Sequence, residues 1–317
     1  MGEFDLIRRH LAGLAPDGPG VRLGIGDDAA WLQPPPGREL VMTLDTLVAG
    51  RHFFPDTDPE ALGHKALAVN LSDLAAMGAQ PLWALFSLTL PEADDAWLAA
   101  LARGMGKLAR RHGLALVGGD TCRGPLAISL QLTGSVAPGK ALLRSGGRPG
   151  DRLYVTGTLG DAALALKILK KGGNPPVELR ERLERPTPRL AEGQTLVGIA
   201  SACIDISDGL IADLNHLCQA SGCGARVELA KLPLSPAVRQ RLAGDWQPVL
   251  AGGDDYELCF AIPEEQIQTL TASGIACTPI GYLTPDQGVT VVDEQGKELP
   301  PMQGWDHFAS NSSHKES

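Results

Sequence analysis

The chain has few aromatic residues, and its cysteines follow no common metal or redox pattern. Aromatics make up 4% of the 317 residues, so a core must consist mostly of Leu, Ala and Val. None of the six cysteines forms a C-x-x-C pair, and the spacing of Cys218 and Cys223 near His216 does not match a zinc site. We expect all six, Cys122 included, to be packed free thiols in a reducing compartment.

Long apolar runs are also missing. No run approaches the ~18 residues that a membrane span needs, and the opening MGEFDLIRRH lacks the apolar core of a secretory signal. The net charge of -9 argues against nucleic acid or an anionic membrane as a partner. We therefore expect a cytoplasmic protein, in which bound metal ions could still bring a polyphosphate ligand to the surface.

The common nucleotide-binding motifs are absent as well. The chain contains no G-x-x-x-x-G-K-[ST], no G-x-G-x-x-G, no H-R-D and no D-F-G. If the protein transfers phosphate, it does so without a P-loop and without a protein-kinase site.

Short strands interleaved with helices predict an α/β or α+β fold of two domains. Helices are expected over 3–14, 58–79, 95–113, 159–171, 188–201, 208–221 and 263–273. Strands are expected over 40–48, 81–90, 114–120, 126–136, 152–156, 202–206, 225–229, 256–262 and 275–283. Glycine and proline crowd residues 144–157, which predicts domains over 1–148 and 149–310 and a disordered tail over 311–317.

Aspartates recur beside glycines after apolar strands, as in "LGIGDDAA", "VMTLD", "LALVGGDT", "CIDISDGL" and "LAGGDDYEL". Each could simply belong to a turn or cap a helix, as Asp208 could before "GLIADL". The adjacent Asp27 and Asp28 lie either in a solvated turn or beside a cation, because like charges repel. Carboxylates held at strand ends are suitable ligands for Mg²⁺, and glycines beside them leave room for phosphate. In "VMTLD" we expect Asp45 to end the strand.

Eight motifs in one order give the chain a resemblance to a known family. They are "LGIGDDAA", "TLDTLVAGRHF", "KALAVNLSDLAAMGA", "GGDTCRGPL", "LRSGGRPGD", "YVTGTLGD", "IDISDGL" and "GGDDYEL". With the terminal "GWDHF", the chain closely resembles the thiamine-monophosphate kinase family over nearly its whole length. That family lies in the superfamily of aminoimidazole ribotide synthetase and selenophosphate synthetase.

The resemblance implies a two-domain fold whose N-terminal domains pair into a dimeric β-barrel, with ATP in the cleft between domains. It implies a homodimeric kinase that transfers the γ-phosphoryl of ATP to thiamine monophosphate with several Mg²⁺ ions. Another ATP-dependent synthetase of the superfamily and a non-catalytic Mg-ATP sensor are the alternatives. The acceptor phosphate has a second pKa near ~6, so direct in-line transfer needs no covalent nucleophile and no strong general base.

Site residues follow from the resemblance by motif. Magnesium ligands are expected at Asp27, Asp28, Thr43, Leu44, Asp45, Asp73, Asp120, Asp205 and Asp208. ATP contacts are expected at Gly119, Asp120, Arg144 and Ser207, and substrate contacts at His52, Asp254 and Trp305. Leu44 stands where relatives often carry a hydroxyl residue, so a contact there uses its backbone; Asp254 stands where Glu is more common.

Overall fold

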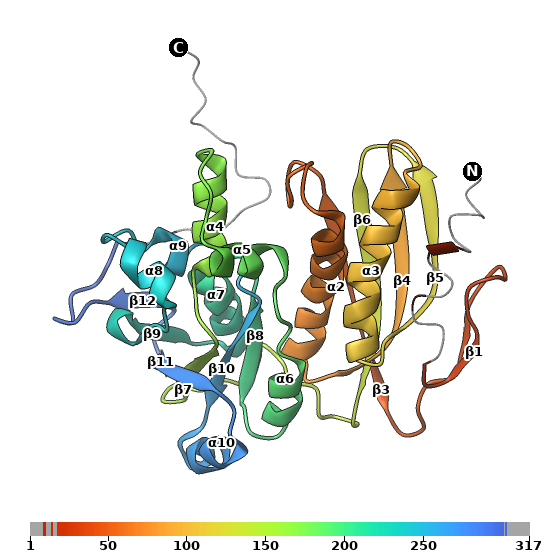
Figure 1. Ribbon diagram of the computed structural model, residues 1–317. Coiled ribbons are helices and arrows are strands. Elements are labelled where there is room, and N and C mark those ends of the chain that lie inside the picture. The colour runs from red at the N-terminus through yellow and green to blue at the C-terminus, as the bar shows by residue number, and fades with distance from the viewer. Residues whose placement is uncertain (1–8, 11–13, 15–17, 301, 303–317) are drawn as a thin grey trace.

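Two β-sheets, one from each half of the chain, organise the computed structural model of the protein (Figure 1). The structure describes residues 9, 10, 14, 18–300 and 302. The predicted tail over 311–317 lies outside these residues, as does most of the predicted helix over 3–14.

The first sheet has four strands in the order β3-β6-β4-β5, of which only β4 and β5 run parallel. Their bounds are β3 (Glu39–Val48), β6 (Ala127–Val136), β4 (Gln80–Leu90) and β5 (Ala115–Arg123). Helices α2 (Pro59–Ala76) and α3 (Asp95–Arg111) cover one face with a core of leucine and alanine. The strands and both helices confirm the predictions to within a few residues.

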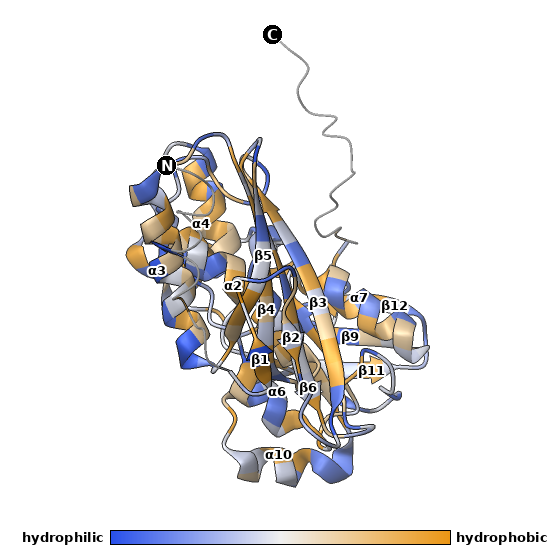
Figure 2. Ribbon diagram, turned by 90° about the vertical axis from the view of Figure 1, so that its right-hand side faces the viewer, coloured by the Kyte–Doolittle hydropathy of each residue, from blue (hydrophilic) through white to orange (hydrophobic). Residues whose placement is uncertain are grey.

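No described helix covers the other face of this sheet; in Figure 2, α2 and α3 lie to the left of β4 and β5. Side chains alternate between the two faces of a strand, so β3 directs Leu47 into the core and exposes Leu40, Met42 and Leu44. A separate hairpin of β1 (Val21–Leu23) and β2 (Trp31–Leu32) packs against Trp83 and Val117. The exposed fraction of Met42 is 66% and that of Leu44 is 64%, which is unusual for apolar side chains on a regular strand.

Helix α2 lies between the two sheets and is buried over most of its circumference. Asp58 caps it by accepting the Ala61 N–H, and Pro59 occupies its first turn. A Cβ at Gly63 would stand 2.0 Å from the carbonyl oxygen of Leu101, so glycine permits the close approach of α3. Because α2 also contacts α6 and β8 of the second half, it is a fixed support for any side chain directed between the halves.

The second sheet has six strands in the order β12-β9-β11-β7-β10-β8. They are β7 (Arg152–Thr156), β8 (Ala202–Ile206), β9 (Gly224–Glu228), β10 (Glu257–Ile262), β11 (Cys277–Thr284) and β12 (Gly288–Val292). Its α-helices are α4 (Asp161–Lys170), α5 (Val177–Glu184), α6 (Leu190–Leu196), α7 (Leu210–Ser221), α8 (Pro236–Arg241), α9 (Gln247–Leu250) and α10 (Ile267–Ser273). Two short 3-10 helices, η2 (Leu229–Lys231) and η3 (Glu264–Gln266), complete this half. The short elements α5, α8, α9 and β12 were not predicted.

The cysteines are all unpaired, and most are buried as expected. Cys277 is half-buried, and Cys122 lies exposed on β5, where its thiol shares a hydrogen bond with the Thr89 hydroxyl. The prediction that Cys122 is a packed thiol is therefore wrong. Separately, none of the helices in the described part of the chain is both long and apolar enough to cross a bilayer.

Candidate functional site

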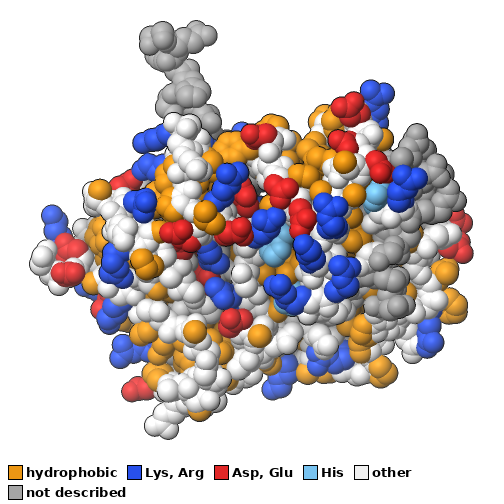
Figure 3. Space-filling view, in the orientation of Figure 1, with side chains coloured by type: hydrophobic (Ala, Val, Ile, Leu, Met, Phe, Trp, Pro, Cys, Tyr) orange, Lys and Arg blue, Asp and Glu red, His pale blue; other side chains and the backbone are white. Residues whose placement is uncertain are grey.

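A pocket of about 770 Å³ opens between the two halves of the molecule. Helix α2 lines one wall with Leu62, Lys65, Val69 and Asp73, whose spacing of three to four residues places them along one side of the helix. The opposite wall comes from α4, the β8–α7 turn and the segment 252–256. In the space-filling view, acidic and basic side chains gather side by side where the two halves meet (Figure 3).

Four predicted acids converge on this pocket from four separate segments. Asp45 comes from β3, Asp73 from α2, Asp205 from the buried strand β8, and Asp208 from the turn that follows β8. Burial, and then the charges of Asp73 and Asp208, raise the pKa of Asp45 to about 6. Burial, followed by the charge of Asp73, raises the pKa of Asp205 to about 8. These carboxylates repel one another, so the pocket favours a ligand that brings positive charge.

Neighbouring polar groups hold these acids in place. The Thr43 hydroxyl donates a hydrogen bond to the Asp73 carboxylate, and Ser72 Oγ donates to Asp205 Oδ2 at 2.8 Å. The side-chain oxygen of Asn70 accepts the Asp45 N–H at 3.1 Å, which ties β3 to α2. The acids are therefore fixed before any ligand binds.

The turn between β8 and α7 is organised by a carboxylate that the sequence analysis missed. Asp213 accepts the backbone N–H groups of Ser207, Asp208 and Gly209 at 3.0, 3.0 and 3.1 Å. Burial and the charge of Asp208 nevertheless raise the pKa of Asp213 to about 7. By holding these three N–H groups, Asp213 sets the direction in which Ser207 and Asp208 face the pocket.

His52, Ser207 and Asp254 also line the pocket, as the sequence analysis expects for ligand contacts. The Val48 N–H donates to Nδ1 of His52 at 2.9 Å, which places the ring proton on Nε2. Asp254 pairs with Lys65 across the pocket, Nζ to Oδ2 3.1 Å. Lys65 is a second residue that the sequence analysis missed, although a lysine among apolar helix positions was a signal for it.

Other predicted residues lie outside this pocket. Asp27 and Asp28 occupy an exposed turn in which Asp27 Oδ1 accepts the Asp28 N–H at 2.8 Å. Arg144 is exposed. Burial raises the pKa of Asp73, and the Thr43 hydrogen bond and the charge of Arg144 oppose part of that rise. Trp305 falls outside the described residues.

Three more predicted residues belong to the first sheet but not to the pocket wall. Leu44 lies on the face of β3 opposite to Asp45, because neighbouring residues of a strand alternate. Asp120 and Gly119 are exposed on the edge strand β5. Asp120 lies opposite Ser87 of β4, which in turn lies opposite Ser129 of β6. A Cβ at Gly119 would come within 1.8 Å of the Phe86 carbonyl oxygen, so only glycine fits there.

The expectation that Asp45 ends its strand is wrong. Strand β3 continues to Val48, because Thr46 and Leu47 still pair with Ser129 and Ile128 of β6. Asp120, expected as the last residue of a strand over 114–120, lies inside β5, which continues to Arg123. The pocket therefore uses the side of β3 as well as the end of β8.

The acids fit magnesium in their chemistry. Among the described residues, no three His, Cys, Asp or Glu side chains converge tightly enough to form a closed metal site. Magnesium does not need such a cage, because it keeps several waters and takes one or two carboxylates together with phosphate oxygens. Asp45, Asp73, Asp205 and Asp208 offer oxygen ligands of this kind.

Comparisons with known proteins identify the relatives of the chain. The AIR synthase related protein family matches with its N-terminal domain over residues 26–136 and with its C-terminal domain over residues 148–294. Thiamine-monophosphate kinase of Salmonella typhimurium is 47% identical, over 98% of this chain and 99% of its own.

Two solved structures share both sequence and fold. The crystal structure of thiamine-monophosphate kinase from Stenotrophomonas maltophilia K279a superposes with a TM-score of 0.85 at 44% identity, covering 94% of this chain and 98% of that one. AaThiL complexed with AMPPCP and TMP superposes with a TM-score of 0.78 at 34% identity, over 97% of each chain. The chain therefore belongs to the AIR synthase related family, and within it to the thiamine-monophosphate kinases.

Proposed function

We propose that the protein transfers the γ-phosphoryl group of ATP to thiamine monophosphate, yielding ADP and thiamine diphosphate. The observation that carries this proposal is the pocket on which half-buried and buried acids from both halves of the chain converge, in a protein of the thiamine-monophosphate kinase family. A related structure holds AMPPCP, an ATP analogue, together with TMP. Donor and acceptor are both anions, so a site for this reaction must overcome their repulsion.

Magnesium ions held by Asp45, Asp73, Asp205 and Asp208 would supply that compensation. The remaining ligands assigned by motif are Asp27, Asp28, Thr43, Leu44 and Asp120. Burial and mutual repulsion raise the pKa values of Asp45 and Asp205, and bound cations would offset both effects.

The other residues bind and orient the two substrates. Gly119, Asp120, Arg144 and Ser207 are assigned to ATP, and His52, Asp254 and Trp305 to the acceptor. No cysteine lines the described part of the pocket, and the acceptor phosphate is mostly dianionic at pH 7 with a second pKa near ~6. Direct in-line transfer, driven by position and charge compensation, therefore needs no covalent intermediate.

The two halves correspond to two domains, which we place at residues 1–148 and 149–310. We also place the protein in the cytoplasm. The family matches end at residue 136 and resume at residue 148, which supports this division.

The uncovered face of the first sheet supports a homodimer. Leu40, Met42, Leu44 and Leu85 are exposed there, and a second copy of the same sheet would bury them as a closed barrel. In such a pair Asp120 and Gly119 face the partner copy instead of solvent, which accounts for their position outside the pocket of a single chain.

Substitution of Met42 by Glu tests the dimer. We expect Met42→Glu to convert a dimer into a monomer in light scattering at micromolar protein, because it places a charge in an apolar interface. Val177→Glu is the matched control, since Val177 is 74% exposed on α5, away from this sheet. A wild-type monomer, or a Met42→Glu dimer of unchanged stability, would contradict the pairing.

The activity itself is tested with purified protein, ATP, Mg²⁺ and a panel of phosphomonoesters. We expect ADP and thiamine diphosphate in equal amounts with thiamine monophosphate, and at least about tenfold less product with any other acceptor. A sensor would bind Mg-ATP in calorimetry but release no ADP with any acceptor. A synthetase would release ADP without forming a diphosphate, so either result would contradict the proposal.

A further inference from the structure

An ion pair crosses the pocket between the two halves. Lys65 extends from α2, and its Nζ lies 3.1 Å from Oδ2 of Asp254 in the segment that precedes β10. The Lys65 side chain is 5% exposed and that of Asp254 is 27% exposed, and both line the pocket. A lysine this deeply buried is rare, and its desolvation is tolerated only because a carboxylate stands beside it.

The segment that carries Asp254 is held in an unusual backbone conformation. Asp254 has φ +70° and Tyr256 has φ +49°. Residues other than glycine rarely adopt positive φ values of this size. The Tyr256 hydroxyl donates to Asp254 Oδ1 at 2.9 Å, and the Asp254 N–H donates to the Ser207 carbonyl at 2.9 Å. The Asp254 carboxylate is thus aimed into the pocket by its own backbone and by Tyr256.

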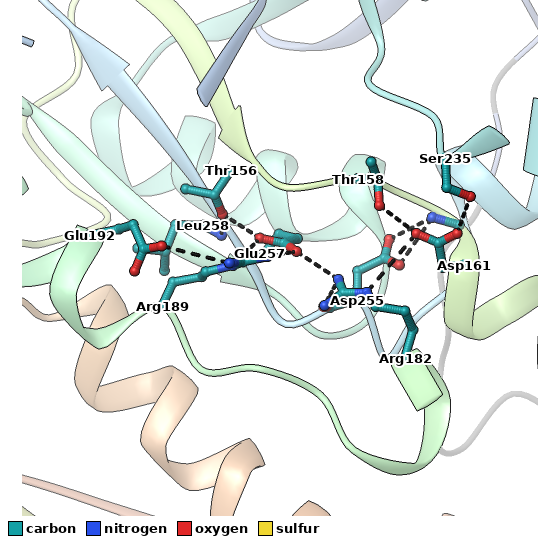
Figure 4. A network of polar contacts seen from close by, with 11 residues as sticks. Thr156, Thr158, Asp161, Arg182, Arg189, Glu192, Ser235, Asp255, Glu257 and Leu258 are labelled. Atoms are coloured by element: carbon teal, nitrogen blue, oxygen red, sulfur yellow. Dashed lines mark hydrogen bonds and ion pairs between the residues drawn. The ribbon is translucent and has the colours of Figure 1, made fainter. Parts of the chain in front are cut away.

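A second network anchors the opposite side of the same segment (Figure 4). Glu257 is fully buried and accepts hydrogen bonds from Arg182 and Arg189, each at 2.6 Å. Asp255 accepts the Gly160 N–H, 3.0 Å from Oδ1. Alternate residues therefore face alternate sides: Asp255 and Glu257 lock the segment, while Asp254 and Tyr256 face the pocket. Since the segment is anchored without Lys65, the lysine is not needed merely to hold it.

We propose that Lys65 binds the acceptor phosphate, while Asp254 faces the cationic ring of the same molecule. This inference rests on the proposed function. In the ion pair each charged group compensates the other, and together the two groups are complementary to a ligand that carries one fixed cation and one phosphate. Such a ligand replaces the ion pair with two charge-assisted contacts. The acceptor class is therefore a phosphomonoester joined to a permanent cation.

The position of Lys65 along α2 agrees with this role. Lys65 and Asp73 lie on the same pocket-facing side of the helix, eight residues apart, which is about 12 Å along the axis. Of the residues with which α2 lines the pocket, Val69 lies between these two, and it carries no charge. An acceptor phosphate held by Lys65 would therefore lie on the path toward the acid cluster.

The test compares two ligands that differ only in the phosphate: thiamine monophosphate and thiamine. Calorimetry gives the Kd of each for wild type, Lys65→Met and the control Lys107→Met, a lysine paired with Glu60 on the surface. We expect Lys65→Met to raise the Kd for thiamine monophosphate at least tenfold. The Kd for thiamine should stay unchanged or fall, because Asp254 no longer pairs with Lys65. Lys107→Met leaves both constants unchanged, and the KM for ATP stays within twofold in both variants.

If Lys65 had only a structural role, Lys65→Met would raise the Kd of both ligands by the same factor, and that outcome would overturn the proposal. If Lys65→Met does not fold, Lys65→Arg is measured in its place. A Lys65→Arg protein that keeps the wild-type preference for the phosphorylated ligand supports the proposal. A folded Lys65→Arg protein that loses this preference overturns it. A wild type that makes no thiamine diphosphate refutes the proposed function instead. An active wild type with an unchanged ligand ratio in Lys65→Met refutes only this inference.

Discussion

Asp73→Asn is expected to lower kcat for thiamine diphosphate formation by at least about 10³-fold, a loss typical of removing an electrostatic group from a phosphoryl-transfer site. Asp73 lies where α2 meets Asp45 and Asp205, and it receives the Thr43 hydroxyl. The amide keeps the shape of the side chain and can still accept that hydrogen bond. It removes the negative charge that a magnesium ion needs.

The fold of this variant should survive, because the substitution removes repulsion from a cluster of like charges. Thermal unfolding in the absence of Mg²⁺ should show a midpoint equal to or above that of wild type. Asp286→Asn, an exposed acid in the turn after β11, is the control and should keep full activity. If Asp73→Asn retained most of its kcat, the assignment of the acids to magnesium would be wrong.

The stability of the ligand-free protein is expected to fall as pH rises from 6 to 8.5, and Asp205 is the main cause. Its folded-state pKa of about 8 lies above the value of 3.8 that applies in the unfolded chain. The folded state therefore holds a proton that the unfolded state has lost, so the contribution is complete below pH 3.8 and disappears as pH rises through about 8. Asp213, with a pKa of about 7, adds to the same trend.

Asp205→Asn isolates this effect, since asparagine does not titrate. Relative to wild type, the variant should gain on the order of 2 kcal/mol of unfolding free energy between pH 6 and pH 8.5. That gain corresponds to a rise of roughly 4 °C in the melting midpoint. The comparison with wild type cancels the histidines, of which His64 and His112 have lowered pKa values because of burial.

Magnesium should reverse the trend in the wild type only. At pH 8.5, Mg²⁺ with ATP is expected to stabilise wild type more than Asp205→Asn, because only the wild type has a carboxylate at position 205 for the cations to compensate. Calorimetric melts at the two pH values, with and without the ligands, provide the measurement. Parallel pH profiles for wild type and Asp205→Asn would show that Asp205 is ionised throughout and that the acids do not interact as described.

The regular elements of the fold were predictable because their patterns are long and local. Helix α2 combines the capping residue Asp58, Pro59 and a long helical repeat, and β4 and β6 are apolar runs bounded by turns. Helices α8 and α9 have six and four residues, too few to show a repeat. Strand β12 pairs in parallel with β9, which is distant in the sequence, and no local signal indicates this pairing.

The acids were recognisable from the sequence, but their spatial grouping was not. The motif "NLSDLAAMGA" marked Asp73, and the same motif also contains Asn70 and Ser72, whose roles appear only once β3 and β8 are seen to pack against α2. Asp45 and Asp120 occur in similar sequence contexts, yet the sheet directs them to different surfaces. The Lys65–Asp254 pair joins residues 189 positions apart, which only the tertiary fold brings together.

The proposed reaction depends on divalent cations bound by acids from both halves of the chain, and Mn²⁺ offers the most direct measurement of that binding. Crystals grown with Mn²⁺, AMPPCP and thiamine monophosphate should show anomalous scattering peaks at the carboxylates of Asp45, Asp73 and Asp205, between the phosphates of the two ligands. Phosphates bound in the pocket with no peak beside these carboxylates, or peaks confined to surface acids, would contradict it.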